Sequence, residues 1–476
     1  VVGRPVVDGE GVTFNGVVAT NGFQPLWEVG VMGVVAVAPL LGIDGDVAQI
    51  RLVALVSVAL ALGALVLLNR LVEGFGGGGI ARLAGSALLV AYLAGPFGML
   101  GSEAHLATVL VLLAALLLHR ITEGDVPAAT GDAVWFGITL GLVVLARLDL
   151  VFLAAGFGLV LLLAAQQRPD LVARRIVAVS GLTAAAVVAP YLVWNLARFG
   201  HLVPISGALK YDLSDPRFSV ASVGRVGLGL LAIAVVAGGY GYLGEGERLT
   251  GRRIWLVLLG GAAAASAYTF VAAQDDFTTW NWYYVPHALA AAVGCAASAH
   301  RVGERAALRD RGPAVSAAVA ALSVVVLVAS VAMVVRRPLS SVQDQRDATL
   351  AFSRELARRV PPTGRIATVD LPGVLAFASD RPVVALDGLT NDFDFQDDLV
   401  DRGASCTLHE LGVTHLVTYE SGPASADTID DGLVLGVRSL LHGADAGVIE
   451  IDESDEVFRG SSPRMVVWRI DPDCSP

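Results

Sequence analysis

Lys210 is the only lysine in a chain of 476 residues that carries 33 lysine and arginine side chains in total. It ends the segment Phe199-Gly-His-Leu-Val-Pro-Ile-Ser-Gly-Ala-Leu-Lys210, which lies between two apolar runs. An ammonium group is a compact charge that pairs with phosphate oxygens. Lys210 is therefore a candidate to bind a phosphate or diphosphate at a membrane surface. The alternative is an interfacial lysine whose ammonium group extends to the lipid headgroups.

Three further charged residues lie within or beside apolar runs. Glu103 belongs to Gly101-Ser-Glu103, and a carboxylate at membrane depth is costly enough to indicate a function. It could orient a sugar hydroxyl, bind a cation or act as a base; the alternative is an exposed turn residue. Arg147 and Asp149 interrupt one apolar stretch. These opposite charges could contact a substrate, or they could simply neutralise each other.

The segment 274–284 concentrates aromatic side chains beside an apolar run. Its sequence is Gln274-Asp-Asp-Phe-Thr-Thr-Trp-Asn-Trp-Tyr-Tyr284. Tryptophan and tyrosine favour the headgroup region, which predicts membrane anchoring. The competing interpretation is a carbohydrate platform, where indole faces stack on sugars and Asp275 or Asp276 accepts hydrogen bonds from hydroxyls. His287, one turn further on, is interpreted as a packed histidine.

The composition is that of a membrane protein. Hydrophobic residues make up 55% of the chain and charged residues 16%, with a mean hydropathy of +0.65. A soluble domain has about 45–50% apolar and about 25% charged residues, so a soluble globular enzyme is excluded. The tail from Leu339 to Pro476 carries 24 acidic and 11 basic side chains. Nucleic acid is excluded as a partner, because phosphate contacts require clustered lysine and arginine.

Apolar runs recur over most of the chain. A hydrocarbon core of about 30 Å needs about 20 apolar residues for each spanning helix. The runs cover 27–43, 52–69, 80–99, 104–119, 133–146, 150–166, 176–197, 226–243, 253–272, 284–299 and 314–335. We expect about 10–11 membrane helices, with 27–43 as a juxtamembrane or re-entrant element that does not cross.

The loops between these runs give an orientation, because lysine and arginine accumulate on the cytoplasmic side. Alternate loops carry Arg70, Arg82, Arg120, Arg168, Arg174, Arg175, Arg248, Arg252, Arg253, Arg301, Arg305, Arg309 and Arg311. We place these loops inside. The Glu103 turn, the Arg147–Asp149 turn, loops 198–225 and 274–283 and the tail then share the outer side.

From Leu339 onward the pattern changes to a charged helix followed by short β-branched runs. The runs are 365–370, 382–387, 413–419 and 465–470, with a helical stretch at 398–412. Such strands alternating with helices are typical of an α/β domain. The sequence therefore predicts a polytopic α-helical membrane protein with a C-terminal soluble α/β domain. We expect three parts: 1–26, the end of a first external loop; 27–338, the multi-pass membrane domain; and 339–476, the external domain.

Motifs for several other chemistries are absent from the sequence. It has no GxSxG, Walker loop, HExxH or GxGxxG with a following helix, so hydrolase, NTPase, zinc-protease and dinucleotide functions have no support. Cys295, Cys406 and Cys474 lack metal-ligand spacing, and we predict no metal site. Cys406 and Cys474 could form a disulfide if the tail faces an oxidising compartment; the alternative is unpaired thiols.

The polar segments, in their order along the chain, resemble those of membrane glycosyltransferases of the GT-C class. They are Gly11-Val-Thr-Phe-Asn-Gly16, Thr20-Asn-Gly-Phe-Gln-Pro-Leu-Trp27, Gly101-Ser-Glu103, Ala146-Arg-Leu-Asp149, Pro204-Ile-Ser-Gly-Ala-Leu-Lys210, Trp282-Tyr-Tyr284 and Leu386-Asp-Gly-Leu-Thr-Asn391. Each motif alone is weakly specific. Their order and common side make the combination more specific, and together they cover nearly the whole chain.

The resemblance implies an enzyme that transfers a sugar from a polyprenyl-phosphate donor to a cell-envelope glycan, lipid or protein at the outer face of the cell membrane. It implies that Lys210 contacts the donor phosphate, with Ser206 and Gly207 shaping the loop. Glu103 would line the cavity near the sugar. The remaining substrate-binding candidates are Asn21, Gln24, Trp27, Arg147, Asp149, Trp282, Tyr283 and Asp387.

The resemblance also bears on the base and on cofactors. In the class, the usual catalytic base is an aspartate in the first external loop, before the Gly-Phe-Asn-Gly type segment. We expect that aspartate upstream of Val1, with Glu103 as the candidate base within this sequence. The partners are membrane lipids, the polyprenyl-phosphate-linked sugar and the acceptor. A divalent cation is left open as a cofactor, because only some members of the class use one.

Two functions of other classes compete with the enzyme. A membrane transporter or lipid flippase would show internal repeats and interrupted helices with polar sites at the midplane. The two halves of this sequence do not match, and the polar residues gather on one side. The other alternative is a non-catalytic membrane scaffold whose acidic tail binds a partner.

Overall fold

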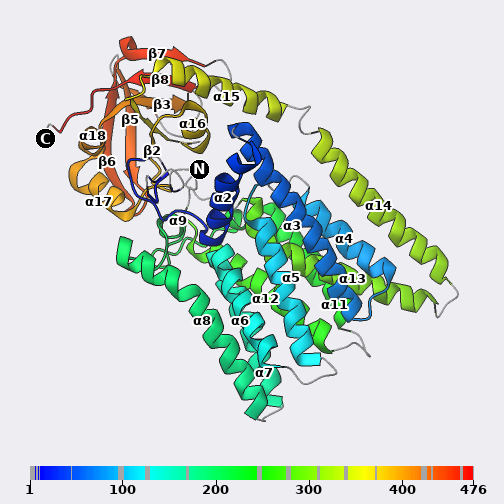
Figure 1. Cartoon of the computed structure of the whole chain (residues 1–476). Helices are drawn as coiled ribbons and strands as arrows, with labels where there is room; N and C mark the ends of the chain where they lie inside the picture. The colour runs from blue at the N-terminus through cyan, green and yellow to red at the C-terminus, as the bar shows by residue number, and fades with distance from the viewer. Residues whose placement is uncertain are drawn as a thin grey trace. The chain divides into compact units, whose positions relative to one another are not determined.

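The structure is a computed structural model of the chain (Figure 1). It describes Val6, Gly9 and residues 11–14, 16–43, 45–94, 101–123, 129–167, 171–243, 249–274, 280–307, 311–336, 341–369, 372–419, 426–429, 432–460 and 465–474. Asp275 and Asp276, the carboxylates of the predicted carbohydrate platform, lie outside the described residues.

Contacts between residues divide the chain into two units. One consists of Gln24–Leu192 and Asp212–Arg336, and we call it the helical unit. The other consists of Val1–Phe23, Val193–Tyr211 and Arg337–Pro476, and we call it the α/β unit. Its C-terminal part begins close to the predicted boundary at residue 339. The grouping of the first residues and of 193–211 with the tail was not predicted.

The helical unit is built from the predicted apolar runs. Its helices are α2 (Pro25–Val37), α3 (Asp46–Gly74), α4 (Gly79–Leu93), α5 (Ala104–Glu123), α6 (Thr130–Ala146), α7 (Val151–Gln167), α8 (Leu171–Phe199, whose end enters the α/β unit), α10 (Val220–Val223), α11 (Arg225–Tyr242), α12 (Leu249–Ala272), α13 (Val285–Ala307) and α14 (Gly312–Arg336). Short 3-10 turns lie at η1 (Pro39–Leu41), η2 (Leu148–Leu150) and η3 (Asn281–Tyr284).

Seven helices among the described residues are long and apolar enough to cross a membrane, and α4, α6 and the α2–η1 segment are shorter apolar helices. The chain is thus a multi-pass membrane protein, as predicted. Helix α2 has 13 residues, which rise about 20 Å, less than the ~30 Å of a hydrocarbon core. Since α4 and α6 are also short, the expectation that this element does not cross stays a prediction.

Helix α13 is the most enclosed element of the helical unit and packs against α4 and α11. Small residues permit the close approach. A Cβ added at Gly294 of α13 would lie 2.8 Å from the backbone nitrogen of Gly238 on α11, so neither position has room for a larger residue. Small residues at helix contacts are typical of membrane bundles, where helices associate by close packing.

The tail forms the predicted α/β fold. Helices α15 (Ser341–Arg359), α16 (Pro372–Ser379), α17 (Phe393–Arg402) and α18 (Ala404–Glu410) accompany strands β1 (Arg365–Thr368), β2 (Val383–Ala385), β3 (Val413–Tyr419), β4 (Ala426–Ile429), β5 (Gly432–Ser439), β6 (Ala444–Ile451), β7 (Glu456–Arg459) and β8 (Met465–Arg469). One sheet has the order β2-β1-β3-β8-β7, and the other has the order β4-β5-β6.

The four predicted strands are neighbours in the larger sheet, with β2 at one edge. Strand β1 pairs in parallel with β2 and β3, and β8 pairs antiparallel to β3. Consecutive residues of β1, β2 and β8 are buried, as expected for strands covered on both faces. Strands β4 to β7 were not predicted. The α/β unit also contains α9 (Ile205–Lys210).

Candidate active site

Arg147 is placed by a break between two helices. Helix α6 ends at Ala146, Arg147 is extended with φ −155° and ψ 116°, and η2 begins at the next residue. The break turns the side chain into the protein, where it is 1% exposed. A buried guanidinium requires partners, because an uncompensated charge in a low-dielectric interior is costly.

The partners of Arg147 are two carboxylates and a carbonyl. Its Nε and Nη2 donate to the two oxygens of Asp149 at 3.1 and 2.9 Å. Its Nη1 donates to Glu103 Oε1 at 2.7 Å and to the carbonyl oxygen of Trp282 at 2.9 Å. The guanidinium carbon lies 4.5 Å from the centre of the Tyr283 ring. Four of the predicted substrate-binding residues and the candidate base therefore form one cluster, which we call the Arg147 cluster.

The carboxylates of the Arg147 cluster are its accessible part. The Glu103 side chain is 14% exposed and that of Asp149 is 27% exposed. The alternative of a well-exposed turn residue is therefore wrong for Glu103. One guanidinium balances one of the two carboxylates, so the cluster has an excess negative charge. It can accept hydrogen bonds from hydroxyl groups, while the hydrogen bonds from Arg147 hold both carboxylates in place.

The aromatic residues of η3 extend this cluster. The Trp280 and Trp282 rings lie parallel, with centroids 5.3 Å apart, and Trp282 stacks on Tyr283 at 6.1 Å. Tyr92 on α4 donates to the carbonyl oxygen of Asn281 at 3.0 Å. Trp280 is 56% exposed, so the row of rings runs from the buried guanidinium to the surface of the unit. Such a row suits either predicted role, membrane anchoring or sugar stacking.

Two candidates at the start of α2 belong to the same unit. Gln24 precedes the helix, and its Oε1 accepts a hydrogen bond of 3.2 Å from the backbone nitrogen of Leu148. This bond ties α2 to the turn between Arg147 and Asp149. Trp27 lies in the first turn of α2 and is half-buried. Gln24 thus supports the Arg147 cluster.

The remaining candidates belong to the α/β unit. Lys210 ends α9, and the buried residues Ile205 and Leu209 hold that helix against the unit. Ser206 and Gly207 are half-buried in its first turn, and the Gly207 nitrogen donates to the carbonyl oxygen of Pro204 at 2.9 Å. A side chain at position 207 would crowd Val203, because an added Cβ would lie 2.9 Å from Val203 Cγ1.

Asn21 and Asp387 have local partners in the same unit. Asn21 is completely buried. Its Nδ2 donates to Asn195 Oδ1 at 2.8 Å, and its Oδ1 accepts from the Ile205 nitrogen at 2.9 Å. Asp387 accepts from the Leu389 nitrogen at 3.0 Å, in the turn after β2. Asn21 therefore fixes backbone in this structure, and its contact with an acceptor hydroxyl stays a prediction.

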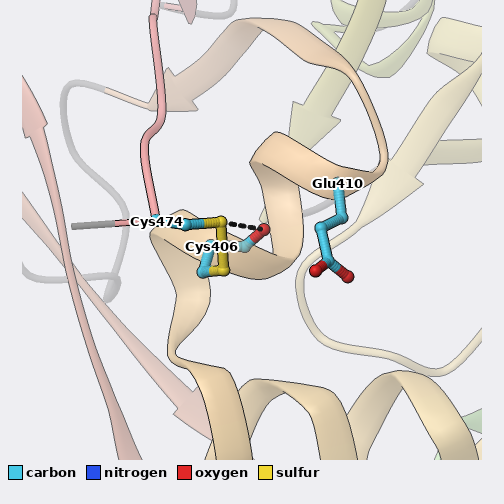
Figure 2. Close-up of side chains that lie close together, drawn as sticks. All are labelled: Cys406, Glu410 and Cys474. Carbon is cyan, nitrogen blue, oxygen red and sulfur yellow. Dashed lines mark hydrogen bonds between the residues drawn. A yellow bond between two sulfur atoms is a disulfide. The ribbon is translucent and has the colours of Figure 1, made fainter. Parts of the chain in front are cut away.

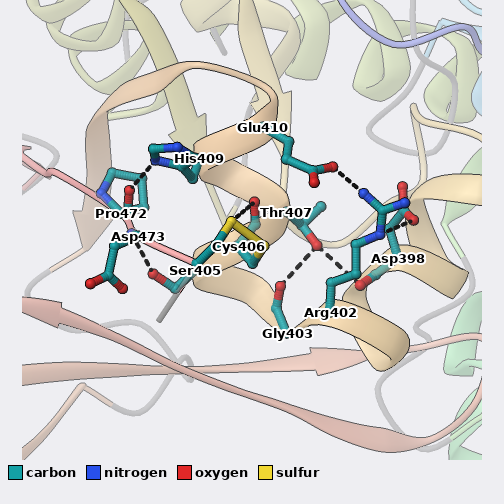
Figure 3. The surroundings of a disulfide bond; sticks show 11 residues. Asp398, Arg402, Gly403, Ser405, Cys406, Thr407, His409, Glu410, Pro472 and Asp473 are labelled. Atoms are coloured by element: carbon teal, nitrogen blue, oxygen red, sulfur yellow. Dashed lines mark hydrogen bonds and ion pairs between the residues drawn. A yellow bond between two sulfur atoms is a disulfide. The ribbon is translucent and has the colours of Figure 1, made fainter. Parts of the chain in front are cut away.

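One group of potential metal ligands occurs among the described residues. Cys406, Glu410 and Cys474 have ligand atoms within 4.8 Å of one another (Figure 2). The two cysteines form a disulfide, however, which realises one of the two predicted alternatives. Thiolates bind metals, and a disulfide has none. Glu410 also pairs with Arg402 (Figure 3). The group therefore does not fit a metal ion while the disulfide is intact.

The surroundings of the disulfide fasten the C-terminal segment to α18. His409 Nδ1 donates to the carbonyl oxygen of Pro472 at 2.6 Å, and the Asp473 nitrogen donates to Ser405 Oγ at 3.1 Å (Figure 3). These bonds lie on both sides of Cys406 in the sequence. The covalent link and the hydrogen bonds together hold the chain end on the helix.

Sequence reasoning missed three residues that the structure places beside the candidates. Asn195 is completely buried and binds Asn21. His201 stacks on Phe393 of α17. A signal existed for Asn195, because an amide within an apolar run requires partners. Nothing in the local sequence indicates that His201 and Phe393 meet.

Solved structures with the same fold are known, although no protein-family model and no curated protein matches the chain. ArnT from Cupriavidus metallidurans in the apo state aligns with a TM-score of 0.55 and 15% identity, over 100% of this chain and 93% of ArnT. ArnT bound to undecaprenyl phosphate gives a TM-score of 0.54 at 15% identity, with the same coverage.

The archaeal oligosaccharyltransferase AglB from Archaeoglobus fulgidus, in complex with an inhibitory peptide and a dolichol-phosphate, is also similar. It aligns with a TM-score of 0.51 and 14% identity, over 87% of this chain and 64% of AglB. The chain therefore has the polytopic fold of the GT-C class, as the sequence motifs indicated.

Proposed function

We propose that this protein is a membrane glycosyltransferase that transfers a sugar from a polyprenyl-phosphate donor to a cell-envelope glycan, lipid or protein acceptor at the outer face of the cell membrane. The observation that carries the proposal is the Arg147 cluster within a GT-C fold: a buried guanidinium holds two partly exposed carboxylates beside a row of aromatic rings. Comparable solved folds bind undecaprenyl phosphate and dolichol-phosphate.

Each group has a role in this reaction. The leaving polyprenyl phosphate requires positive charge, which Lys210 supplies, with Ser206 and Gly207 shaping the turn around it. Glu103 and Asp149 orient hydroxyls of the sugar, and the rings of Trp282 and Tyr283 stack on it. Arg147 already donates to Glu103 Oε1 and so holds that carboxylate in one orientation. Glu103 is therefore assigned the orientation of a sugar hydroxyl.

The outer-face location has separate support. The disulfide between Cys406 and Cys474 belongs to an oxidising compartment, since thiols stay reduced in the cytosol. The arginine-rich loops favour the same orientation. No described residue is assigned to a divalent cation in this proposal.

The test begins with donor binding. The full-length protein in lipid nanodiscs is titrated with undecaprenyl phosphate, and with undecaprenol as the control without phosphate. We expect Lys210→Ala to weaken undecaprenyl phosphate binding about 10–100-fold, because a hydrogen bond to a charged group contributes about 1.5–3 kcal/mol. Lys210→Arg should retain part of the affinity. The matched control is Arg217→Ala, which removes a half-exposed cation paired with Asp215.

Transfer is then measured with a panel of synthetic donors, in which undecaprenyl phosphate carries a labelled pentose or hexose. The label is followed into the lipid, glycan and protein fractions of membranes. Lys210→Ala should reduce transfer without changing the amount of protein in the membrane. Equal affinity for undecaprenol and undecaprenyl phosphate, or parental binding by Lys210→Ala, would refute the proposed donor site.

A further inference from the structure

We propose that helix α17 of the C-terminal domain positions the donor-binding helix α9, with Phe393 and Asn195 as the positioning residues. The proposal rests on the proposed function, because it assigns to Lys210 the binding of the donor phosphate. All the residues concerned belong to the α/β unit. Two independent contacts, one polar and one aromatic, meet at the turn that begins α9.

The polar contact is a pair of buried amides. Asn195 is completely buried near the end of α8. Its Nδ2 donates to the carbonyl oxygens of His201 and Leu202 at 2.9 and 3.0 Å. Its Oδ1 accepts from Asn21, whose own Oδ1 accepts from the Ile205 nitrogen. The two side chains thus fix the backbone at positions 201, 202 and 205, at both ends of the turn.

The aromatic contact comes from the C-terminal domain. The Phe393 and His201 rings stack with centroids 3.7 Å apart and planes inclined by 13°. Phe393 also forms a buried apolar cluster with Ile205 and Leu209. Ile205 and Leu209 are four residues apart, so they lie on one face of α9. Phe393 therefore holds both the turn before α9 and the buried face of the helix itself.

Phe393 is itself firmly placed. It is the first residue of α17, and the preceding Asp392 caps the helix by accepting from the Phe395 nitrogen at 3.0 Å. Gln396, one turn on, is completely buried and accepts from Ser439 Oγ at 2.9 Å. Ser439 ends β5. Helix α17, which contacts α9 through Phe393, is thus anchored to the sheet β4-β5-β6.

Helix α9 depends on these contacts for its position. It has six residues, and a helix shorter than about 12 residues is marginal by itself. Lys210 follows Leu209 directly, so a shift of the helix backbone at Leu209 moves the ammonium group. A misplacement of about 1 Å can cost about 100-fold in a reaction that depends on positioning. Phe393 and Asn195 consequently act on the donor through Lys210.

A double-mutant cycle tests this coupling in the full-length protein, with undecaprenyl phosphate as the probe. We expect Phe393→Ala to weaken binding about 5–30-fold in the parental protein and less than about twofold in Lys210→Ala, since residues that act through one another are not additive. Phe393→Tyr keeps the ring and should restore binding. The control is Phe458→Ala, which truncates a ring that contacts Phe352 in another core cluster of the domain.

Asn195→Asp provides a second variant in case Phe393→Ala unfolds the domain. It has nearly the same volume and keeps the acceptor for Asn21, but it places an oxygen against the carbonyls of His201 and Leu202. We expect Asn195→Asp to weaken undecaprenyl phosphate binding in the parental protein and to have little further effect in Lys210→Ala. Additive effects with Lys210→Ala, or parental affinity in both Phe393→Ala and Asn195→Asp, would overturn the positioning role. Parental affinity in Lys210→Ala itself would instead refute the proposed function.

Discussion

Arg147 and Glu103, 44 residues apart in the sequence, are joined by a hydrogen bond of 2.7 Å from Nη1 to Oε1. The same guanidinium binds Asp149 through two nitrogens. The bond connects the start of α5 with the break between α6 and α7. A single side chain therefore holds three segments of the helical unit together, because it also donates to the carbonyl oxygen of Trp282.

Arg147→Met should destabilise the helical unit severely. It leaves two carboxylates without their cation, and breaking a buried ion pair costs about 3–5 kcal/mol. We expect a large fall in the thermal unfolding midpoint in detergent, together with loss of transfer. The control is Arg120→Ala, where the arginine side chain is 71% exposed in its pair with Asp132 and should matter little. Equal stability of the two variants would contradict a structural role for Arg147.

Glu103→Gln distinguishes the effect of Glu103 on stability from its effect on sugar transfer. The Gln amide oxygen can still accept from Arg147 Nη1, so the unfolding midpoint should change little. The carboxylate that orients a hydroxyl is lost, and we expect transfer to fall by about 100-fold, as for other losses of substrate positioning. Glu73→Gln is the matched control, because Glu73 is 67% exposed and pairs only loosely with Arg82 at 3.8 Å. Undiminished transfer by Glu103→Gln would remove Glu103 from the site.

The apolar runs and the charge pattern were sufficient to predict the helices and the C-terminal α/β fold. Membrane helices and buried parallel strands are encoded locally, in continuous apolar segments. Strands β5 and β6 were missed because Gly436 and Gly447 interrupt them. In addition, charged residues such as Arg438 and Asp445 face solvent from these strands, which hides the apolar pattern.

The candidate site was predictable in its parts and not in its connections. The pairing of Arg147 with Asp149 could be foreseen from their spacing. The bond from Arg147 to Glu103 could not, because it depends on which helices pack together. The same limit applies to Phe393 and His201, whose rings meet across 192 positions of sequence only once the tail has folded.

The disulfide should stabilise the C-terminal domain and report the side of the membrane on which it lies. It joins Cys406 and Cys474 across 68 residues, and closure of a loop of that length contributes about 4 kcal/mol. Cys406→Ser/Cys474→Ser should therefore lower the unfolding midpoint of the domain. In intact cells, we expect a maleimide-polyethylene glycol reagent to label these cysteines only after reduction.

Cys295 supplies the internal control for that labelling, because it lies on α13 and has no disulfide partner among the described residues. Cys295→Ser should leave the labelling that appears after reduction unchanged. Labelling of Cys406 and Cys474 without reductant would contradict an oxidised pair, and absence of labelling after reduction would contradict an outer-face domain.

Asp392 should make the stability of the C-terminal domain depend on pH. Burial raises the pKa of its carboxyl group above the ordinary value, despite the hydrogen bond from the Phe395 nitrogen. The folded state therefore favours the protonated form. The contribution of this group to stability is greatest below the unfolded pKa and is lost as the pH rises through the folded pKa.

Asp392→Asn keeps a strong N-cap residue and removes the ionisation. We expect its unfolding midpoint to exceed that of the parental protein at pH 7 and the advantage to disappear near pH 4. Asp452→Asn is the opposite control, because hydrogen bonds from Ser454 lower the pKa of the Asp452 carboxyl group. That variant should be less stable than the parent at pH 7 and equal to it at low pH. A pH-independent difference between Asp392→Asn and the parent would show that the charge of Asp392 does not oppose folding.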